Sequence, residues 1–528
     1  MSNKITFKDK TLKLRDGIKL RAKLWIPHGK GPWPALVMRQ PYGMDIASTV
    51  TYAHPSWWAN NGYLVVIQDV RGQGESEGVF KGFNQERADT TETHKWVREL
   101  PECNGLLGTF GFSYQGLTQL LAEPGTPPPE CLAPAMTGIN ERDHWCSEGG
   151  AYWWHIGISW GLQLAAQKLR KSNNLKGWEE IRESIESKSY LRYGKELLKK
   201  YDSKGMAYQW LKASSQGNNQ WMVHKPLDSW IKQPILLIGG WWDPHLNGII
   251  EIYKRSIEAG GDPEIHIGPA THLQWWEGSN QLQLEFFNRH LKKSHTLKDK
   301  PHINLWNLTN KSWDAKSKAE EIFSTPEQWS AQSNGLACAS TKEGKLVSNR
   351  IGKGNIILVH DPWRPVPAIG GHLSPTPGEI NREQIDTRGD VATFTTDIFN
   401  KEKFINGHPI FELEANSNTK GFDLFISLSI IYKYDSSVNQ LSTGVCRILG
   451  KDAKIKTKRQ VILQPIHAVF PKGSQMRISI SGSAWPAIAI NPGLAEKQCE
   501  APSPNCLITT IFLDLSKSKL KLNHIFDK

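Results

Sequence analysis

Short apolar runs alternate with helical patterns along the first third of the chain. The runs PALVM and GYLVVIQD are almost wholly apolar, which is typical of parallel strands buried on both faces. Residues 84–100 carry apolar side chains on one side of a predicted helix. LLGTFGF and LAPAMTG are further predicted strands, with a helix over 114–123 between them. A hairpin is predicted over 12–27, where Asp-Gly supplies the turn. This alternation predicts a parallel sheet with helices on its faces.

The pattern becomes purely helical after residue 143. Trp178, Ile181 and Ile185 follow helical spacing, which indicates helices inserted into the α/β unit. Strand patterns resume at PILLIGG and PEIHIG. Beyond residue 325 the helical patterns end, and runs such as DLFISLSI alternate between two faces, as half-buried antiparallel strands do.

These changes divide the sequence into four segments. Residues 1–143 and 230–325 are predicted to form one α/β domain, and residues 144–229 its helical cap. Residues 326–528 are predicted to form a C-terminal β-sandwich of the jelly-roll type.

Composition narrows the class of protein. No run of about 18 apolar residues occurs in the 528-residue sequence, and its opening lacks the apolar core of a signal peptide, so a soluble cytoplasmic protein is expected. The net charge is +12, but lysine and arginine lie in short separate runs, which favours a solvated surface over nucleic-acid binding. The seven cysteines are never spaced as C-x-x-C, so free thiols are expected, with no metal and no cofactor.

Tryptophan is abundant and clustered. Several of the 22 tryptophans fall within residues 145–160 and 241–276. Core packing alone would explain many of them, because aromatic side chains bury large areas. Their closeness to the candidate site also suggests an apolar substrate pocket. The pocket is assigned to Trp145, Trp153, Trp154 and Trp242.

Two serines compete as a nucleophile. Ser76 matches the G-x-S-x-G pattern literally, in GESEG, but two glutamates flank it and would oppose an oxyanion. Ser113 directly follows a predicted strand and precedes a predicted helix, in GTFGFSYQGL. A sharp turn there would expose its oxygen at the carboxyl end of the sheet, where open α/β sheets bind ligands. Ser113 is therefore the preferred nucleophile.

A base and an orienting carboxylate are expected after later strands, in the order Ser, Asp, His. His272 follows the strand PEIHIG, whereas His266 lies within it and would point to a sheet face. Asp243 follows PILLIGG and could hold the imidazole's tautomer. His245 is interpreted as a pocket-wall or surface residue, and Asp262 as a turn residue.

Several motifs together resemble those of the cocaine esterase-like (CocE/NonD) hydrolases, which are related to X-prolyl dipeptidyl-peptidases and α-amino acid ester hydrolases. They are RQPYG, QDVRGQGESEG, CNGLLGTFGFSYQG, LAPAMTG, GGWWD, IGPATH, DPWRPVPAIGG and RGDV. The family elbow is G-x-S-Y-x-G, which accommodates Gln115. The resemblance implies a triad of Ser113, Asp243 and His272 on an α/β-hydrolase sheet. It also implies that the Tyr42 hydroxyl and the Tyr114 backbone N–H form the oxyanion hole.

The predicted activity is hydrolysis of an ester or amide through an acyl-enzyme, by a carboxylesterase for apolar or aromatic acyl groups. An X-prolyl dipeptidyl-peptidase or α-amino acid ester hydrolase is the alternative, and it would need a carboxylate such as Glu141, Asp143 or Glu148 to hold an ammonium group. An inactive binding protein on the same scaffold is the alternative of another class.

Two further expectations concern partners and structure. The expected partner is a small-molecule ester or amide, with no nucleic acid and no membrane, and a homo-oligomer stays open. In QDVRG, Asp69 and Arg71 are predicted to pair beneath the site.

Overall fold

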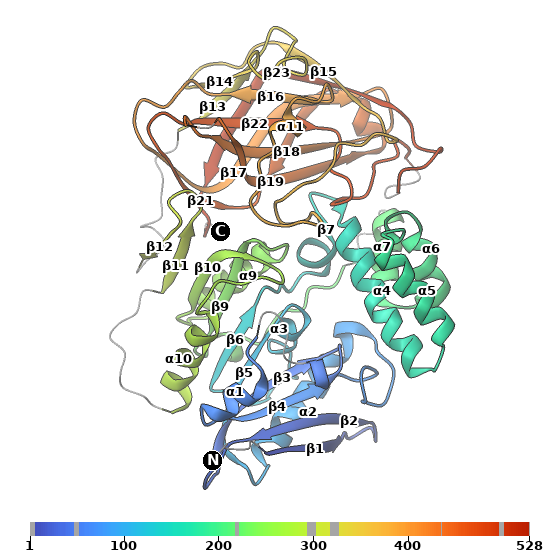
Figure 1. The fold of residues 1–528 in the computed structure, drawn as a ribbon, viewed down its shortest axis with the longest axis vertical. Helices are drawn as coiled ribbons and strands as arrows, with labels where there is room; N and C mark the ends of the chain where they lie inside the picture. The colour runs from blue at the N-terminus through green and yellow to red at the C-terminus, as the bar shows by residue number, and fades with distance from the viewer. Residues whose placement is uncertain are drawn as a thin grey trace.

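The computed structural model has three parts (Figure 1): an open sheet with flanking helices, a helical cap at its side and an all-β domain against both. It describes residues 6–46, 52–216, 221–292, 302–316, 327–434, 436–495 and 501–526.

The first sheet has ten strands in the order β1-β2-β4-β3-β5-β6-β9-β10-β11-β12. Strands β4 through β11 in this order run parallel, and antiparallel pairs close both edges. The strands are β1 (Thr6–Lys13), β2 (Lys19–Ile26), β3 (Trp33–Gln40), β4 (Leu64–Asp69), β5 (Cys103–Phe112), β6 (Cys131–Ala135), β9 (Leu236–Trp242), β10 (Glu264–Thr271), β11 (Ile303–Asn307) and β12 (Ser312–Lys316). Every residue of β4 is buried, which agrees with its unbroken apolar pattern.

Helices pack on the faces of this sheet. They are α1 (Pro55–Asn60), α2 (Glu86–Arg98), α3 (Tyr114–Thr118), α8 (Asp228–Ile231), α9 (Leu246–Glu258) and α10 (Ser279–Leu291), with short 3₁₀ turns η1 (Met44–Ile46) and η2 (Gly82–Gln85). Helix α3 is shorter than predicted. Beyond it, the N–H groups of Leu120 and Leu121 bond to carbonyls three residues back, so the helix tightens into a turn ahead of Pro124.

The cap is inserted between β6 and β9. It begins with the π-turn η3 (Arg142–Cys146) and the small hairpin β7 (Ser147–Glu148) and β8 (Ala151–Tyr152). Its four helices are α4 (Trp154–Lys171), α5 (Leu175–Glu186), α6 (Tyr190–Asp202) and α7 (Met206–Gln216). Helix α4 packs against the other three, so it is the central helix of the cap.

The C-terminal domain is an eleven-stranded, nearly closed sheet in which all strand pairs are antiparallel except β14 with β16. Its main path is β19-β18-β22-β16-β14-β13-β23-β17-β20, with β15 on β23 and β21 on β17. The strands are β13 (Trp329–Gln332), β14 (Lys345–Ser348), β15 (Asn355–His360), β16 (Val391–Thr395), β17 (Lys403–Ser417), β18 (Gly421–Ile431), β19 (Val438–Leu449), β20 (Thr457–Ile462), β21 (Ile466–Phe470), β22 (Gln475–Ser481) and β23 (Thr509–Asn523). Two short helical turns interrupt it, α11 (Glu383–Asp386) and η5 (Gly450–Lys454). The predicted α/β-hydrolase class with a cap and an all-β C-terminal domain is confirmed.

Strand β18 differs from its prediction as a half-buried strand, because it is buried on both faces. One face looks into the C-terminal domain. On the other, Phe425 packs against a cluster that includes Trp153 and Ile488. The start of the cap therefore covers this strand.

Backbone hydrogen bonds join the cap to the C-terminal domain where α4 begins. The N–H of Trp154 donates to the carbonyl of Ala487 (3.0 Å), and that of His155 to Pro486 (2.9 Å). These N–H groups lie in the first turn of α4, where a helix offers no acceptor of its own. The C-terminal domain thus provides hydrogen-bond acceptors for the first N–H groups of the central cap helix.

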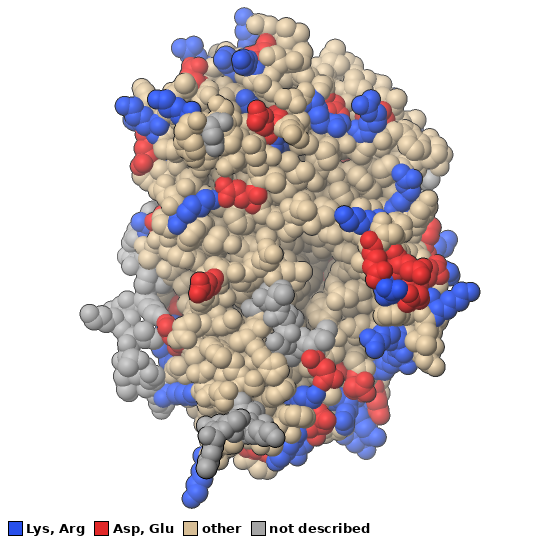
Figure 2. Space-filling model, in the orientation of Figure 1, with Lys and Arg blue, Asp and Glu red and all other residues tan. Residues whose placement is uncertain are grey.

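Charges are mixed on the face drawn in Figure 2, where lysine and arginine side chains are interspersed with aspartate and glutamate. Among the helices of the described segments, none is long and apolar enough to cross a membrane.

Candidate active site

Ser113 lies in a sharp turn between β5 and α3. Its backbone has φ 58° and ψ −127°, a conformation that L residues rarely adopt, and its side chain is nearly buried. A Cβ added at Gly111 would lie 2.5 Å from Cβ of Gln115, and one at Gly116 would lie 2.8 Å from the Thr137 side chain. The two glycines of GFSYQG therefore allow the close approaches that form the turn.

His272 and Asp243 meet at the same edge of the sheet. Each directly follows its strand, β10 or β9, and Nδ1 of His272 lies 2.6 Å from Oδ1 of Asp243. The Asp243 side chain is fully buried, and its Oδ2 accepts the backbone N–H of His245 (3.0 Å). The imidazole also packs on Phe112, with ring centroids 5.2 Å apart. His272 thus contacts the residue that immediately precedes Ser113.

Tyr42 extends from the loop after β3 toward the same point. Its hydroxyl hydrogen-bonds with the Ser113 side chain and accepts the indole N–H of Trp160 (3.1 Å). Burial raises the pKa of Tyr42 to about 12, against the lowering effect of these two hydrogen bonds. The phenol therefore stays protonated at neutral pH and can act as a hydrogen-bond donor.

Tyr114 begins helix α3, so its backbone N–H has no acceptor within the helix. Its side chain points into the protein, where the hydroxyl donates to Oε1 of Glu86 (2.8 Å). Glu86 in turn pairs with Arg39 at 2.6 Å, and both side chains are almost fully buried. This ion pair anchors the residue that follows Ser113.

The competing residues lie elsewhere or serve the fold. Ser76 is fully buried, donates to the carbonyl of Asp69 (2.7 Å) and accepts the backbone N–H of Arg21 (2.8 Å). His266 lies within β10, beside Asn304. Asp262 is an exposed loop residue near His302.

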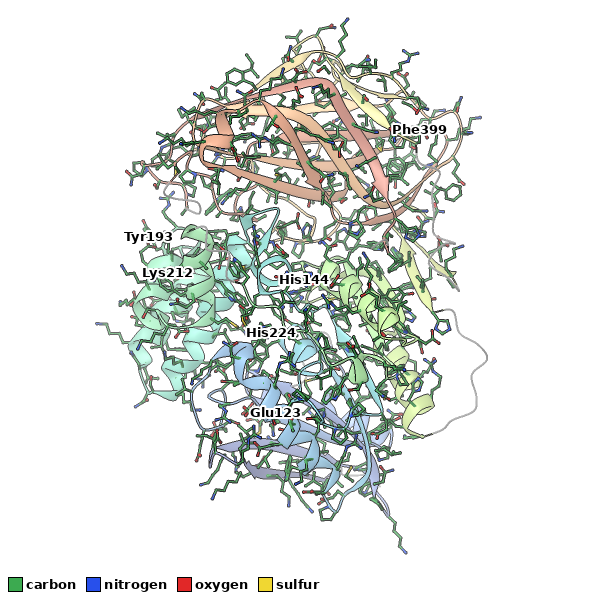
Figure 3. All side chains as sticks on the ribbon, turned by 180° about the vertical axis from the view of Figure 1, so that it is seen from behind. Glu123, His144, Tyr193, Lys212, His224 and Phe399 are labelled. Atoms are coloured by element: carbon green, nitrogen blue, oxygen red, sulfur yellow. The ribbon has the colours of Figure 1, made fainter. Side chains whose placement is uncertain are left out.

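His245 is buried beside the site. Its Nδ1 lies 2.6 Å from the carbonyl of His144, and its ring centroid is 5.0 Å from that of His272. Burial lowers the pKa of His245 to about 4, so the imidazole is neutral at pH 7. His144 is labelled in Figure 3, in the middle of the molecule beneath the C-terminal domain.

The predicted pairing of Asp69 with Arg71 is wrong. Arg71 forms a two-bond contact with Asp89 of α2 (2.7 and 3.0 Å) and also binds Asp16 (2.5 Å). Asp69 instead accepts the backbone N–H of Glu75 (2.9 Å), and burial raises its pKa to about 6. Arg71 pairs with carboxylates that are distant in the sequence, and its local sequence does not indicate these partners.

The four tryptophans assigned to the pocket divide into two groups. Trp154 is fully buried in packed interior, where it contacts Trp485 of the C-terminal domain. Trp153, 1% exposed, contacts the ring of His245 (5.9 Å) beside the site. Trp145 packs against His245 at 4.6 Å, beside the site. Trp242, partly buried, immediately precedes Asp243.

The three carboxylates considered for an ammonium group differ in environment. Glu141 is nearly buried and accepts hydrogen bonds from Trp210 (2.9 Å) and His224 (2.7 Å). Figure 3 shows His224 between the cap and the first sheet. Glu148 binds His372 of the C-terminal domain at 2.6 Å. Asp143 is exposed and contacts Asn140 (3.1 Å).

Sequence reasoning missed two residues of the cap that touch Tyr42. Trp160 reaches its hydroxyl, and Gln167 donates from Nε2 to its backbone carbonyl (2.8 Å). Trp160 could have been suspected from the tryptophan cluster, but nothing local singles out Gln167. Within the described ranges, no group of three His, Cys, Asp or Glu residues could hold a metal ion.

Comparisons with known proteins agree with this architecture. Residues 16–274 match the family model of X-Pro dipeptidyl-peptidase (S15 family), and residues 294–522 match that of the X-Pro dipeptidyl-peptidase C-terminal non-catalytic domain. Cocaine esterase from Rhodococcus sp. (strain MB1 Bresler) is 22% identical, over 90% of each chain.

Solved structures with the same fold cover nearly the whole chain. An aminopeptidase from a marine sediment archaeon, Thaumarchaeota archaeon, has a TM-score of 0.73 at 18% identity, covering 98% of this chain and 96% of its own. An α-amino acid ester hydrolase gives 0.69 at 19% identity, with 99% and 97% covered. A CocE/NonD family hydrolase from Staphylococcus aureus gives 0.71 at 16% identity, with 98% and 94% covered. Residues 16–274 are therefore a serine hydrolase domain of the S15 family, followed by the C-terminal domain that accompanies it, and cocaine esterase is among the relatives of the chain.

Proposed function

We propose that Ser113, His272 and Asp243 are the catalytic triad of an esterase. The observation that carries this proposal is the 2.6 Å contact between His272 Nδ1 and a fully buried Asp243, beside the turn that holds Ser113. A carboxylate at Nδ1 keeps the proton on that nitrogen, which leaves Nε2 free to accept a proton from serine.

In the proposed reaction, Ser113 Oγ attacks the acyl carbon while His272 Nε2 takes its proton. The tetrahedral intermediate then collapses, and His272 returns the proton to the departing alcohol. Water repeats the two steps on the acyl-enzyme, which releases the acid and restores the serine.

Two donors are proposed for the oxyanion, the Tyr42 hydroxyl and the Tyr114 backbone N–H. The hydrogen bond between Tyr42 and Ser113 supports the first, because a group near the serine oxygen is also near the carbonyl that it attacks. The position of Tyr114 at the first residue of α3 supports the second.

Esters with uncharged acyl groups are the proposed substrates, rather than X-Pro peptides or amino acid esters. Glu141 is already engaged with two donors inside the protein, Glu148 binds His372 through one carboxylate oxygen while its other oxygen is buried without a partner, and Asp143 is exposed. The polar ring beside His272 is a neutral His245. An ammonium group would therefore gain little from these residues.

The acyl group is proposed to be apolar or aromatic. Trp145 and Trp160 lie in ring contact (6.1 Å), and Trp160 also bonds to Tyr42, so both are next to the reacting centre. Trp242, partly buried, immediately precedes Asp243 in the chain. Burying apolar surface against such rings stabilises a bound acyl chain by roughly 0.8 kcal/mol per CH₂ group.

Labelling with a fluorophosphonate probe tests the proposal directly. We expect one adduct per chain on Ser113, detected by mass spectrometry of the digested protein, and no labelling of Ser113→Ala. Ser76→Ala is the matched control and should label as the unsubstituted protein does. Labelling that persists in Ser113→Ala would assign the nucleophile elsewhere.

A further inference from the structure

Three side chains on one face of the cap helix α4 reach loops at the carboxyl edge of the sheet. Trp160, Gln167 and Lys171 are spaced by seven and then four residues, so they share one helix face. Trp160 and Gln167 both contact Tyr42, across 118 and 125 residues of sequence. The ammonium group of Lys171 donates to the carbonyl of Ser76, in the next loop.

The chemistry of Trp160 fixes the direction of one hydrogen bond. An indole N–H can only donate, so the Tyr42 oxygen must be the acceptor of the 3.1 Å bond. The phenol proton is then free to point elsewhere, and the other hydrogen-bonded neighbour of this hydroxyl is the Ser113 side chain. Trp160 therefore leaves the phenol proton free for an acceptor beside the nucleophile.

The contact with Gln167 holds the backbone of the same residue. Tyr42 is followed by Gly43, whose φ of +100° suits glycine and leaves this turn with little conformational restraint of its own. The Gln167 amide donates to the Tyr42 carbonyl at 2.8 Å, at the peptide that joins these two residues. The side chain of Gln40 bonds to the carbonyl of Gly43 from the sheet side. The turn is thus held from both sides.

We infer that helix α4 positions Tyr42 as an oxyanion donor, with Trp160 orienting its hydroxyl and Gln167 fixing its backbone. Both are positioning residues, because they act on the reaction through Tyr42. The inference rests on the proposed function, since it requires Tyr42 to stabilise the oxyanion. It makes the cap part of the catalytic apparatus as well as a wall of the substrate site.

Gln167 offers the cleaner test. Methionine has a similar length but no donor, so Gln167→Met should lower kcat on an aryl ester by on the order of 10-fold and leave KM nearly unchanged. Gln167→Lys retains a donor and should recover most of the loss. Gln163→Met is the matched control, because Gln163 is exposed on the same helix, and it should match the unsubstituted protein.

A double-mutant cycle tests Trp160, which also packs against other rings. If Trp160 acts through the phenol, Trp160→Phe should lower kcat in the natural background but add no further loss in Tyr42→Phe. If the losses in kcat from Trp160→Phe and Tyr42→Phe multiply in the double variant, the assigned role of Trp160 is overturned. Equal kcat values for Gln167→Met and Gln163→Met would overturn that of Gln167.

Failure of this inference can be told apart from failure of the proposed function. If the unsubstituted protein neither reacts with the fluorophosphonate nor cleaves any ester, the proposed function fails. If it does both while the Gln167 and Trp160 results go against expectation, only the positioning role is lost. Thermal unfolding of each variant, compared with Gln163→Met, identifies any loss that comes from misfolding.

Discussion

Asp243 holds His272 by a 2.6 Å contact between Oδ1 and Nδ1, while its other oxygen accepts a backbone N–H from His245. Both carboxylate oxygens are therefore engaged, in a side chain with no exposure to solvent. Asp243→Asn can present an N–H to the imidazole and favour the wrong tautomer. We expect kcat to fall by roughly 10⁴-fold with the fold retained, as measured by ester hydrolysis and circular dichroism. Activity close to that of the unsubstituted protein would contradict the triad.

Ser113 and Ser76 should separate clearly on substitution. Ser113→Ala removes the proposed nucleophile and should lower kcat by roughly 10⁴-fold or more, with the melting temperature little changed. Ser76→Ala breaks buried hydrogen bonds to Asp69 and Arg21 and should cost about 1 kcal/mol of stability or more while most activity remains. The opposite result would make Ser76 the nucleophile.

Tyr42→Phe removes one proposed oxyanion donor and keeps the ring. We expect kcat to fall by about 10²- to 10³-fold, while KM changes little because the donor acts mainly in the transition state. Steady-state kinetics on an aryl ester measures both constants. An unchanged kcat would exclude the hydroxyl from the mechanism.

Substrate preference should follow the environment of the carboxylates. An uncharged aryl ester should be cleaved with higher kcat/KM than a matched Xaa-Pro anilide, and longer acyl chains should outperform acetate. A panel of p-nitrophenyl esters and aminoacyl p-nitroanilides provides the measurement. A decisive preference for a free-amine anilide, lost when the amine is blocked, would establish the peptidase alternative.

Buried histidines should make the fold sensitive to acid. Burial lowers the pKa of His94 to about 3 and those of His144 and His245 to about 4, whereas an unfolded histidine titrates near 6.5. Below about pH 6.5 these three histidines therefore bind more protons in the unfolded chain than in the folded protein. The contribution of these histidines to stability is fully present above that pH and is lost as the pH falls toward 4, by about 1.4 kcal/mol per pH unit for each group.

His94 is the residue to substitute for this test, because it stacks on Trp230 and a phenyl ring can replace it. Urea unfolding of His94→Phe between pH 7 and 4.5 should show a shallower loss of stability than the unsubstituted protein. His28→Gln changes an exposed histidine and should follow the original profile. Parallel profiles for all three proteins would contradict the assignment.

The sequence was sufficient for the order of strands and helices around Ser113, Asp243 and His272, because each residue follows a strongly patterned strand. The class of fold and the family were also predictable, and both are confirmed. The roles of these residues stay predictions. The partners of Arg71 were not predictable, because ion pairs form between residues that the fold brings together from distant positions.

For the same reason, the surroundings of the tryptophans and the contacts of the cap were not predictable from the sequence. Composition identified an aromatic cluster, but only packing separates Trp145, beside His245, from Trp154, which is enclosed by the cap and the C-terminal domain. Gln167 carries no motif at all. Its contact with Tyr42 depends on how an entire helix lies across the sheet, which local pattern does not specify.

The backbone hydrogen bonds from Trp154 and His155 to Ala487 and Pro486 have a consequence for truncation of the chain. The family describes the C-terminal portion as non-catalytic, which suggests a module that could be removed. Yet that portion supplies the carbonyl acceptors for the first N–H groups of α4. This helix carries Trp160 and Gln167, and both of these residues contact Tyr42. A shortened chain ending after the first sheet would leave the N–H groups at the start of α4 without these carbonyl acceptors. The helix would then hold Tyr42 less firmly. We therefore expect the proposed activity to depend on both portions of the chain rather than on its hydrolase portion alone.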